Sequence, residues 1–125
     1  MIDFQNAAYI KLNYWDPAEA WTALDGILVP GEQIHFTFKG VRDSVTFTDR
    51  RIVALNVQGL TGKKRDYTSL PYKSIQAFSV ETAGTFDLES ELDMWFSGLG
   101  KVRLEFNKKV DIRQLSHLVG DKVLG

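Results

Sequence analysis

The sequence predicts a mainly β domain: a seven-stranded antiparallel barrel or sandwich that follows an N-terminal helical hairpin and is capped by a C-terminal helix. Three observations lead to this fold class. A length of 125 residues suits one hydrophobic core, so we expect a single domain over residues 1–125. From Glu32 onward the apolar residues alternate with a period of two, and turn signals recur about every ten residues. From Asp111 onward the apolar period is helical.

Residues 1–29 are expected to form the helical hairpin. Asp16 is followed by Pro17 and then by Glu19, a pattern typical of a helix start, and the second helix should run from residue 17 to about residue 28. Apolar residues upstream recur at helical spacing and predict the first helix. The residues that share these two faces are Phe4, Ala8, Leu12 and Trp15 in the first helix, and Trp21, Leu24 and Leu28 in the second. The two tryptophans of the hairpin, Trp15 and Trp21, would either form a face for a membrane surface or a partner or pack in the core, and the apolar stripe favours the core.

Residues 30–125 are expected to form the barrel and the closing helix. Segment 52–57 is apolar on both faces, which is typical of a strand covered on both sides. Segments 91–97 and 102–106 predict a hairpin across a turn that contains Gly98. The other expected strands lie within residues 34–39, 45–47, 67–70 and 78–80, and the helix is marked by Ile112, Leu115, Leu118 and Val119.

Composition excludes several classes of function. Fifteen basic and sixteen acidic residues leave a net charge of −1, so the overall charge favours no nucleic acid, and any membrane contact should be peripheral at most. The chain has no cysteine, which removes disulfides and cysteine-ligated zinc and fits a reducing compartment. Asp3 stands where a signal peptide carries positive charge, and no run of about 18 apolar residues occurs. We therefore expect a soluble cytoplasmic protein.

No group of residues nominates an enzyme. The sequence lacks the Gly-x-Ser-x-Gly motif, the phosphate-binding loop of nucleotide hydrolases and the dinucleotide-binding motif. His35 and His117 each stand without a second ligand at metal-binding spacing. We predict no catalytic residues, no metal site and no cofactor.

A row of alternating carboxylates precedes the last predicted hairpin. It consists of Asp87, Glu89, Glu91 and Asp93. Alternation places these side chains on one strand face, where they would either ligate a hard cation or keep the surface soluble. We favour the second interpretation, with pairing across the hairpin to Lys101 and Arg103.

The densest basic cluster is Lys63, Lys64 and Arg65, in a predicted loop. Three cations close together can hold a phosphate or an acidic partner through charge-assisted hydrogen bonds, and Arg42 is a candidate fourth member. A solvated turn is the alternative, because short charge runs usually face water.

Trp95 shares the strand face of the carboxylates and should therefore point away from the core. Aromatic residues anchor the centres of protein interfaces, so Trp95 is a candidate for contact between subunits, and packing under the N-terminal hairpin is the alternative. Segment 52–57, which is apolar on both faces, also indicates a contact between subunits, and its further candidate residues are Val53, Leu55 and Val57.

Several blocks of the sequence resemble the stand-alone bacterial pleckstrin-homology (PH) domain family, over roughly residues 28–118. They are residues 42–52, 59–64, 70–75, 78–88 and 90–92, together with Trp95 and Gly98. The resemblance implies a seven-stranded PH barrel capped by a helix, a tendency to form homo-oligomeric rings and no catalytic activity. Phosphoinositide-binding PH domains carry a basic signature around their first two strands, and Ser44 replaces one of its cations here.

Two hypotheses of function follow. The first is a non-enzymatic PH-like module that assembles into a homo-oligomeric ring and serves as a scaffold for protein interactions. The alternative is a module that binds an anionic ligand or a lipid headgroup through the basic loop at residues 63–65.

Overall fold

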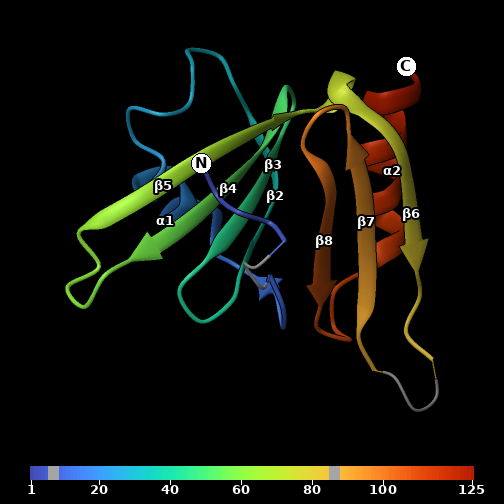
Figure 1. Cartoon of the computed structure of the whole chain (residues 1–125), viewed down its shortest axis with the longest axis horizontal. Helices are drawn as coiled ribbons and strands as arrows, with labels where there is room; N and C mark the ends of the chain where they lie inside the picture. Colours follow the sequence, from blue (N-terminus) through green and yellow to red (C-terminus); the bar gives the residue numbers. More distant parts are fainter. Residues whose placement is uncertain (6–8, 85–87) are drawn as a thin grey trace.

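The structure is a computed structural model that describes residues 1–5, 9–84 and 88–125 (Figure 1). Its strands form two antiparallel sheets, one in the order β1-β2-β3-β4-β5 and one in the order β6-β7-β8. The first sheet consists of β1 (Asn13–Tyr14), β2 (Ile34–Lys39), β3 (Ser44–Thr48), β4 (Arg51–Gln58) and β5 (Lys64–Pro71). The second consists of β6 (Ile75–Glu81), β7 (Ser90–Phe96) and β8 (Gly100–Phe106). The helices are α1 (Pro17–Ala23), the short 3-10 helix η1 (Tyr72–Ser74) and α2 (Ile112–Leu124).

The core lies between the inner faces of the two sheets and α2. Phe38 of β2 is at its centre and is almost fully buried. Its ring centroid lies 5.9 Å from that of Phe47 in the same sheet and 4.9 Å from that of Phe106 in the other. Both pairs meet edge to face, an arrangement that aromatic rings favour. Phe38 therefore joins the two sheets.

The C-terminal helix closes this core, as the sequence predicted. Asp111 accepts a hydrogen bond from the backbone N–H of Gln114 (3.2 Å) and so caps α2. Figure 1 shows α2 running alongside β6 and β7, which it contacts. It buries Ile112, Leu115 and Val119. No helix within the described ranges combines the length and the apolar character that a bilayer crossing requires.

The predicted helical hairpin is wrong. None of the described residues before Pro17 is helical, and residues 13–14 form strand β1 instead. Leu12 donates its backbone N–H to the Glu105 carbonyl (3.1 Å) and forms a bridge to Phe106, so the chain extends along the edge of β8. Unpaired backbone groups at sheet edges must find partners, and the extended segment supplies them. Ala8 lies outside the described residues.

The second predicted helix exists as α1 but ends at Ala23, well before residue 28. Leu24 leaves the helical conformation and Gly26 has a φ of +81°, which favours glycine and ends the helix. A helix of this length buries one narrow face, which holds Ala20, with Leu24 just beyond it. Trp21 lies off that face and is 47% exposed, so its predicted place in the core is wrong.

The described residues form eight strands, against the predicted seven, because β1 adds a short edge strand. The predicted hairpin of segments 91–97 and 102–106 is confirmed by the pairing of β7 with β8. Strand β5 begins at Lys64, earlier than predicted. This earlier start changes where the basic cluster lies, because two of its three cations belong to a strand and not to a loop.

Candidate functional site

The outer face of the five-stranded sheet is the surface on which α1 lies. Val53, Leu55 and Val57 alternate along β4 and point away from the core. The Tyr67 hydroxyl on β5 donates to the carbonyl of Ala23 in α1 (3.0 Å). Val53 is 1% exposed and Leu55 is 4% exposed. The second apolar face of β4 is therefore covered by the chain itself, which leaves Val53 and Leu55 little surface for a contact with another subunit.

A buried ion pair holds the segment after α1 on this sheet. The Glu32 carboxylate is 2% exposed and accepts hydrogen bonds from the Arg51 guanidinium (2.8 and 2.9 Å) and the Thr48 hydroxyl (2.7 Å). Arg51 also donates to the carbonyl of Ile27 (2.8 Å). Burial alone would raise the pKa of Glu32, but the hydrogen bonds from Arg51, Thr48 and the N–H of Val29 outweigh it and lower the pKa to about 2. Glu32 therefore stays ionised while it anchors this segment.

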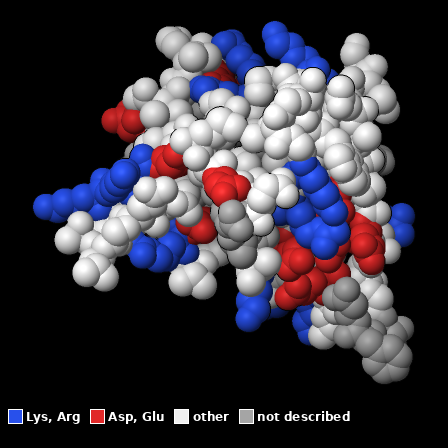
Figure 2. All heavy atoms as spheres, in the orientation of Figure 1, with Lys and Arg blue, Asp and Glu red and all other residues white. Residues whose placement is uncertain are grey.

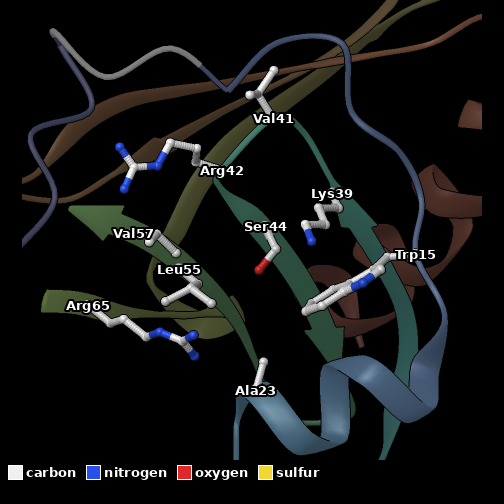
Figure 3. Close-up of a pocket in the computed structure, with 9 residues that line it drawn as sticks. All are labelled: Trp15, Ala23, Lys39, Val41, Arg42, Ser44, Leu55, Val57 and Arg65. Atoms are coloured by element: carbon white, nitrogen blue, oxygen red, sulfur yellow. The ribbon is translucent and has the colours of Figure 1, made fainter. Parts of the chain in front are cut away.

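A pocket of about 240 Å³ opens between α1 and the strands (Figure 3). Part of its apolar lining comes from α1 and from β4, and its polar lining carries positive charge. No acidic residue from the described ranges lines it. The lining residues are Trp15, Ala23, Lys39, Val41, Arg42, Ser44, Leu55, Val57 and Arg65.

The three cations of the pocket are held differently. The Lys39 ammonium lies 5.3 Å from the centroid of the Trp15 ring, a cation–π contact, and Figure 3 shows it directed into the pocket. Arg42 donates to the carbonyl of Gly59 (2.6 Å), which turns its guanidinium toward the rim. Arg65 forms no ion pair or side-chain hydrogen bond with any residue that the structure describes. Lys39 and Arg65 are thus the two cations available to a ligand.

The predicted anion cluster is only partly assembled by the fold. Arg42 and Arg65 line the pocket together, whereas Lys63 and Lys64 do not. Alternation along β5 places Lys64 on the opposite face from Arg65, on the side of Asp66. The hydrogen bond from the N-terminal amine is the largest cause that lowers the pKa of Asp66, and the charge of Lys64 makes a smaller contribution. Lys39 and Trp15 also line the pocket and were not among the site residues predicted from the sequence. The alternation of β2 was the available signal for Lys39, because Phe38 points inward.

The outer face of the three-stranded sheet carries the second candidate surface, around Trp95. Trp95 is 37% exposed, and the Lys101 ammonium lies 5.6 Å from its ring centroid. Asp93 accepts two hydrogen bonds from Arg103 (2.9 and 3.1 Å), and Arg103 also lies 3.7 Å from Glu91. Figure 2 shows these acidic and basic side chains gathered over β7 and β8. The prediction that Trp95 points away from the core is confirmed.

Two members of the acidic row, Glu91 and Asp93, pair across the hairpin with Arg103 and Lys101 as expected. Burial would raise the pKa of Asp93, but hydrogen bonding and charge from Arg103 and Lys101 outweigh it and lower the pKa. The described residues contain no group of three or more side chains placed to hold a metal ion. Asp87 lies outside the described residues.

Strand β6 forms one edge of this sheet and is paired with β7 alone among the described strands. It contains no charged residue before Glu81, and Gln76, Ala77 and Ser79 are exposed along it. Ala77 lies opposite Trp95 in the β6–β7 register. The exposed tryptophan therefore borders an open strand edge.

Comparison with known proteins places these features in a family. The model of the family described as "Bacterial PH domain" matches residues 3–123. The chain is 48% identical to the uncharacterized protein YjqA of Bacillus subtilis, over 74% of this chain and 76% of that one. A protein of Shewanella loihica with a pleckstrin-homology domain has a similar crystal structure, with 34% identity, a TM-score of 0.79 and coverage of 90% of this chain and 97% of that one. A pleckstrin-homology domain from Shewanella amazonensis gives 36% identity and a TM-score of 0.68, over 96% of this chain and 94% of that one. None of these descriptions names an enzymatic activity.

Proposed function

This chain belongs to the bacterial PH domain family, and from that premise we propose that it is a non-enzymatic module that assembles into a homo-oligomeric ring and serves as a scaffold for other proteins. The observation that carries the proposal is Trp95, a large aromatic side chain that is 37% exposed in a face of paired charges. Aromatic residues of this kind are typical anchors at the centres of interfaces, where charged rims surround them.

The open edge of β6 supports the same surface. An unpaired strand edge is a template for another strand, and proteins usually protect such edges with charges or proline. The stretch Gln76 to Val80 carries neither, although a bulge between Ile75 and Ala77 bends its start. A strand from a second copy that paired with β6 would also cover Trp95, because Ala77 lies beside it.

Ring closure adds a geometric requirement. A ring forms when two different surfaces of the same chain meet head to tail and the rotation between neighbours closes. The β6 edge with Trp95 is one such surface, and β5, the outer strand of the other sheet, offers a second edge. Many copies of one surface on a ring would then hold a partner by avidity.

Replacing Trp95 with arginine tests this proposal. We expect the intact chain to run as an oligomer in size-exclusion chromatography with light scattering, and Trp95→Arg to run as a single chain of 14.2 kDa. The expected loss follows because a charge buried at the centre of an interface is strongly unfavourable. Trp21→Arg is the matched control, since Trp21 is 47% exposed on α1 and lies away from this face. If both variants kept the oligomer, or both lost it with native circular dichroism, Trp95 would not be the contact.

A second candidate function, binding of an anionic ligand, is supported by a separate observation. Arg42 and Arg65, two of the cations singled out in the sequence, line one pocket with Lys39, and none of the carboxylates that the structure describes lines it with them. The proposed site is therefore this pocket and not the loop at residues 63–65. The two functions are compatible, because the pocket and Trp95 belong to different sheets.

A further inference from the structure

We infer that the pocket between α1 and the five-stranded sheet binds a small amphipathic carboxylate, a molecule with one negative charge and a short apolar body. The inference rests on the second candidate function above and adds the chemical class of the ligand. Its basis is the combination of an apolar lining, two available cations and a serine hydroxyl in one pocket.

The apolar part of the pocket fits a hydrocarbon or a single aromatic ring. Leu55 and Val57 of β4 and Ala23 of α1 line it, and Figure 3 shows the Trp15 indole reaching across from the far side. A volume of about 240 Å³ exceeds the ~150 Å³ cavity that accepts benzene and lies below the ~300 Å³ at which sites for drug-sized ligands begin. A fully hydrated ion would leave this lining without apolar contacts.

The charged part of the pocket fits one carboxylate. Lys39 and Arg65 approach it from different strands, and Arg65 has no ionic partner among the described residues. An arginine fork binds a carboxylate by two parallel hydrogen bonds, and a nearby ammonium adds to the attraction. With Arg42 engaged by the Gly59 carbonyl, two cations remain for the ligand.

The Ser44 hydroxyl adds a hydrogen-bonding group to the lining of the pocket. Ser44 is 3% exposed, and its hydroxyl forms no hydrogen bond with any residue in the described ranges. Figure 3 shows the hydroxyl oxygen in the pocket, between Lys39 and Leu55. A carboxylate oxygen in the pocket would accept a hydrogen bond from this hydroxyl.

A second, more open hollow of about 480 Å³ continues from the pocket along α1. It shares Trp15, Ala23 and Arg65 with the first and adds Thr22 and Glu19. A longer apolar chain could therefore leave the pocket along the helix, while Glu19 at that end disfavours a second negative charge. The arrangement selects a ligand with its charge at one end.

Calorimetric titration of the intact chain tests the ligand class. The probes are octanoate, octanol with the same body and no charge, inorganic phosphate with charge and no apolar body, and phosphatidylglycerol vesicles. We expect saturable binding of octanoate and at least about tenfold weaker binding of octanol and of phosphate, since each lacks one of the two contacts. In an NMR spectrum that resolves the indole N–H signals, the signal of Trp15 should shift on octanoate binding and that of Trp95 should not.

Two charge variants locate the site. Arg65→Gln should weaken octanoate binding by about tenfold or more, because it removes a charge-assisted pair. Lys63→Gln removes the same charge two residues away and outside the pocket, and it should leave the affinity unchanged. Neither cation has a hydrogen-bond or ion-pair partner among the described residues, so both variants should fold.

The outcomes separate this inference from the proposal beneath it. If phosphate bound as tightly as octanoate, the anion-binding function would stand and the amphipathic ligand would be wrong. If no probe bound, both would be wrong. Equal binding of octanol, an equal loss in Lys63→Gln, or binding to the vesicles without binding to free octanoate would also overturn the inference.

Discussion

Glu32→Gln is expected to destabilise the fold by about 3–5 kcal/mol at pH 7, the usual loss when one partner of a buried ion pair is removed. The variant leaves the Arg51 guanidinium, which is itself largely buried, without its carboxylate. It also weakens the contacts through which the Thr48 hydroxyl and the Val29 N–H are satisfied. Urea unfolding at pH 7, followed by tryptophan fluorescence, measures the change.

The same residue predicts a dependence on pH. The pKa of Glu32 falls from 4.5 to about 2 on folding, so ionised Glu32 stabilises the native state by about 3 kcal/mol. A lowered pKa in the folded state means that this stabilisation is fully present above about pH 4.5 and is lost as the pH falls toward 2. Glu32→Gln should therefore be less sensitive to acid than the unmodified chain over this range.

An exposed carboxylate provides the control for Glu32. Glu19 lies on the exposed face of α1, so Glu19→Gln should change the free energy of unfolding by less than about 0.5 kcal/mol. If Glu32→Gln were as stable as Glu19→Gln, or if its stability fell with acid as steeply as that of the unmodified chain, the ion pair would not anchor the segment after α1.

Phe38→Ala is the second change with a large expected effect, a loss of about 3–5 kcal/mol. The substitution leaves a cavity where the two sheets meet, because the Phe38 ring contacts both Phe47 and Phe106. Aromatic pairs at these distances stabilise the fold beyond the effect of the apolar area that each ring buries. The rigid strands around them also allow little collapse into the cavity that the substitution leaves. Thermal unfolding monitored by circular dichroism measures the loss.

Phe36→Ala is the matched comparison on the same strand. Phe36 is only partly buried and stacks on Phe38 at a centroid distance of 6.4 Å, so its loss should be clearly smaller. Equal losses for the two variants would contradict the central position of Phe38 in the core.

The strands and α2 were predictable because local pattern and burial agree there. Alternation around Phe38 and Phe47 and the helical spacing after Asp111 match the faces that the fold buries. The N-terminal segment was not predictable in this way. Leu12 fits a helical period, yet its conformation is decided by the backbone of β8, which is distant in sequence.

The candidate site was predictable in its parts but not in its assembly. The apolar second face of β4 correctly indicated cover on both sides, but the sequence does not say that α1 supplies it. Arg65 was singled out by its basic neighbours, whereas its selection over Lys64 depends on the register that pairs it with Val57. The roles of Lys39 and Trp15 likewise depend on the pairing of Lys39 with Ser44 and on the place of α1.

The central claim is that this PH domain functions as an assembly of identical chains. The most direct test is the solution mass of the unmodified chain by light scattering, measured from micromolar concentration upward at low and high salt. The account predicts a mass that is a fixed multiple of 14.2 kDa at every concentration and at both salt levels. A mass of 14.2 kDa throughout would contradict it and leave ligand binding at the α1 pocket as the function to pursue.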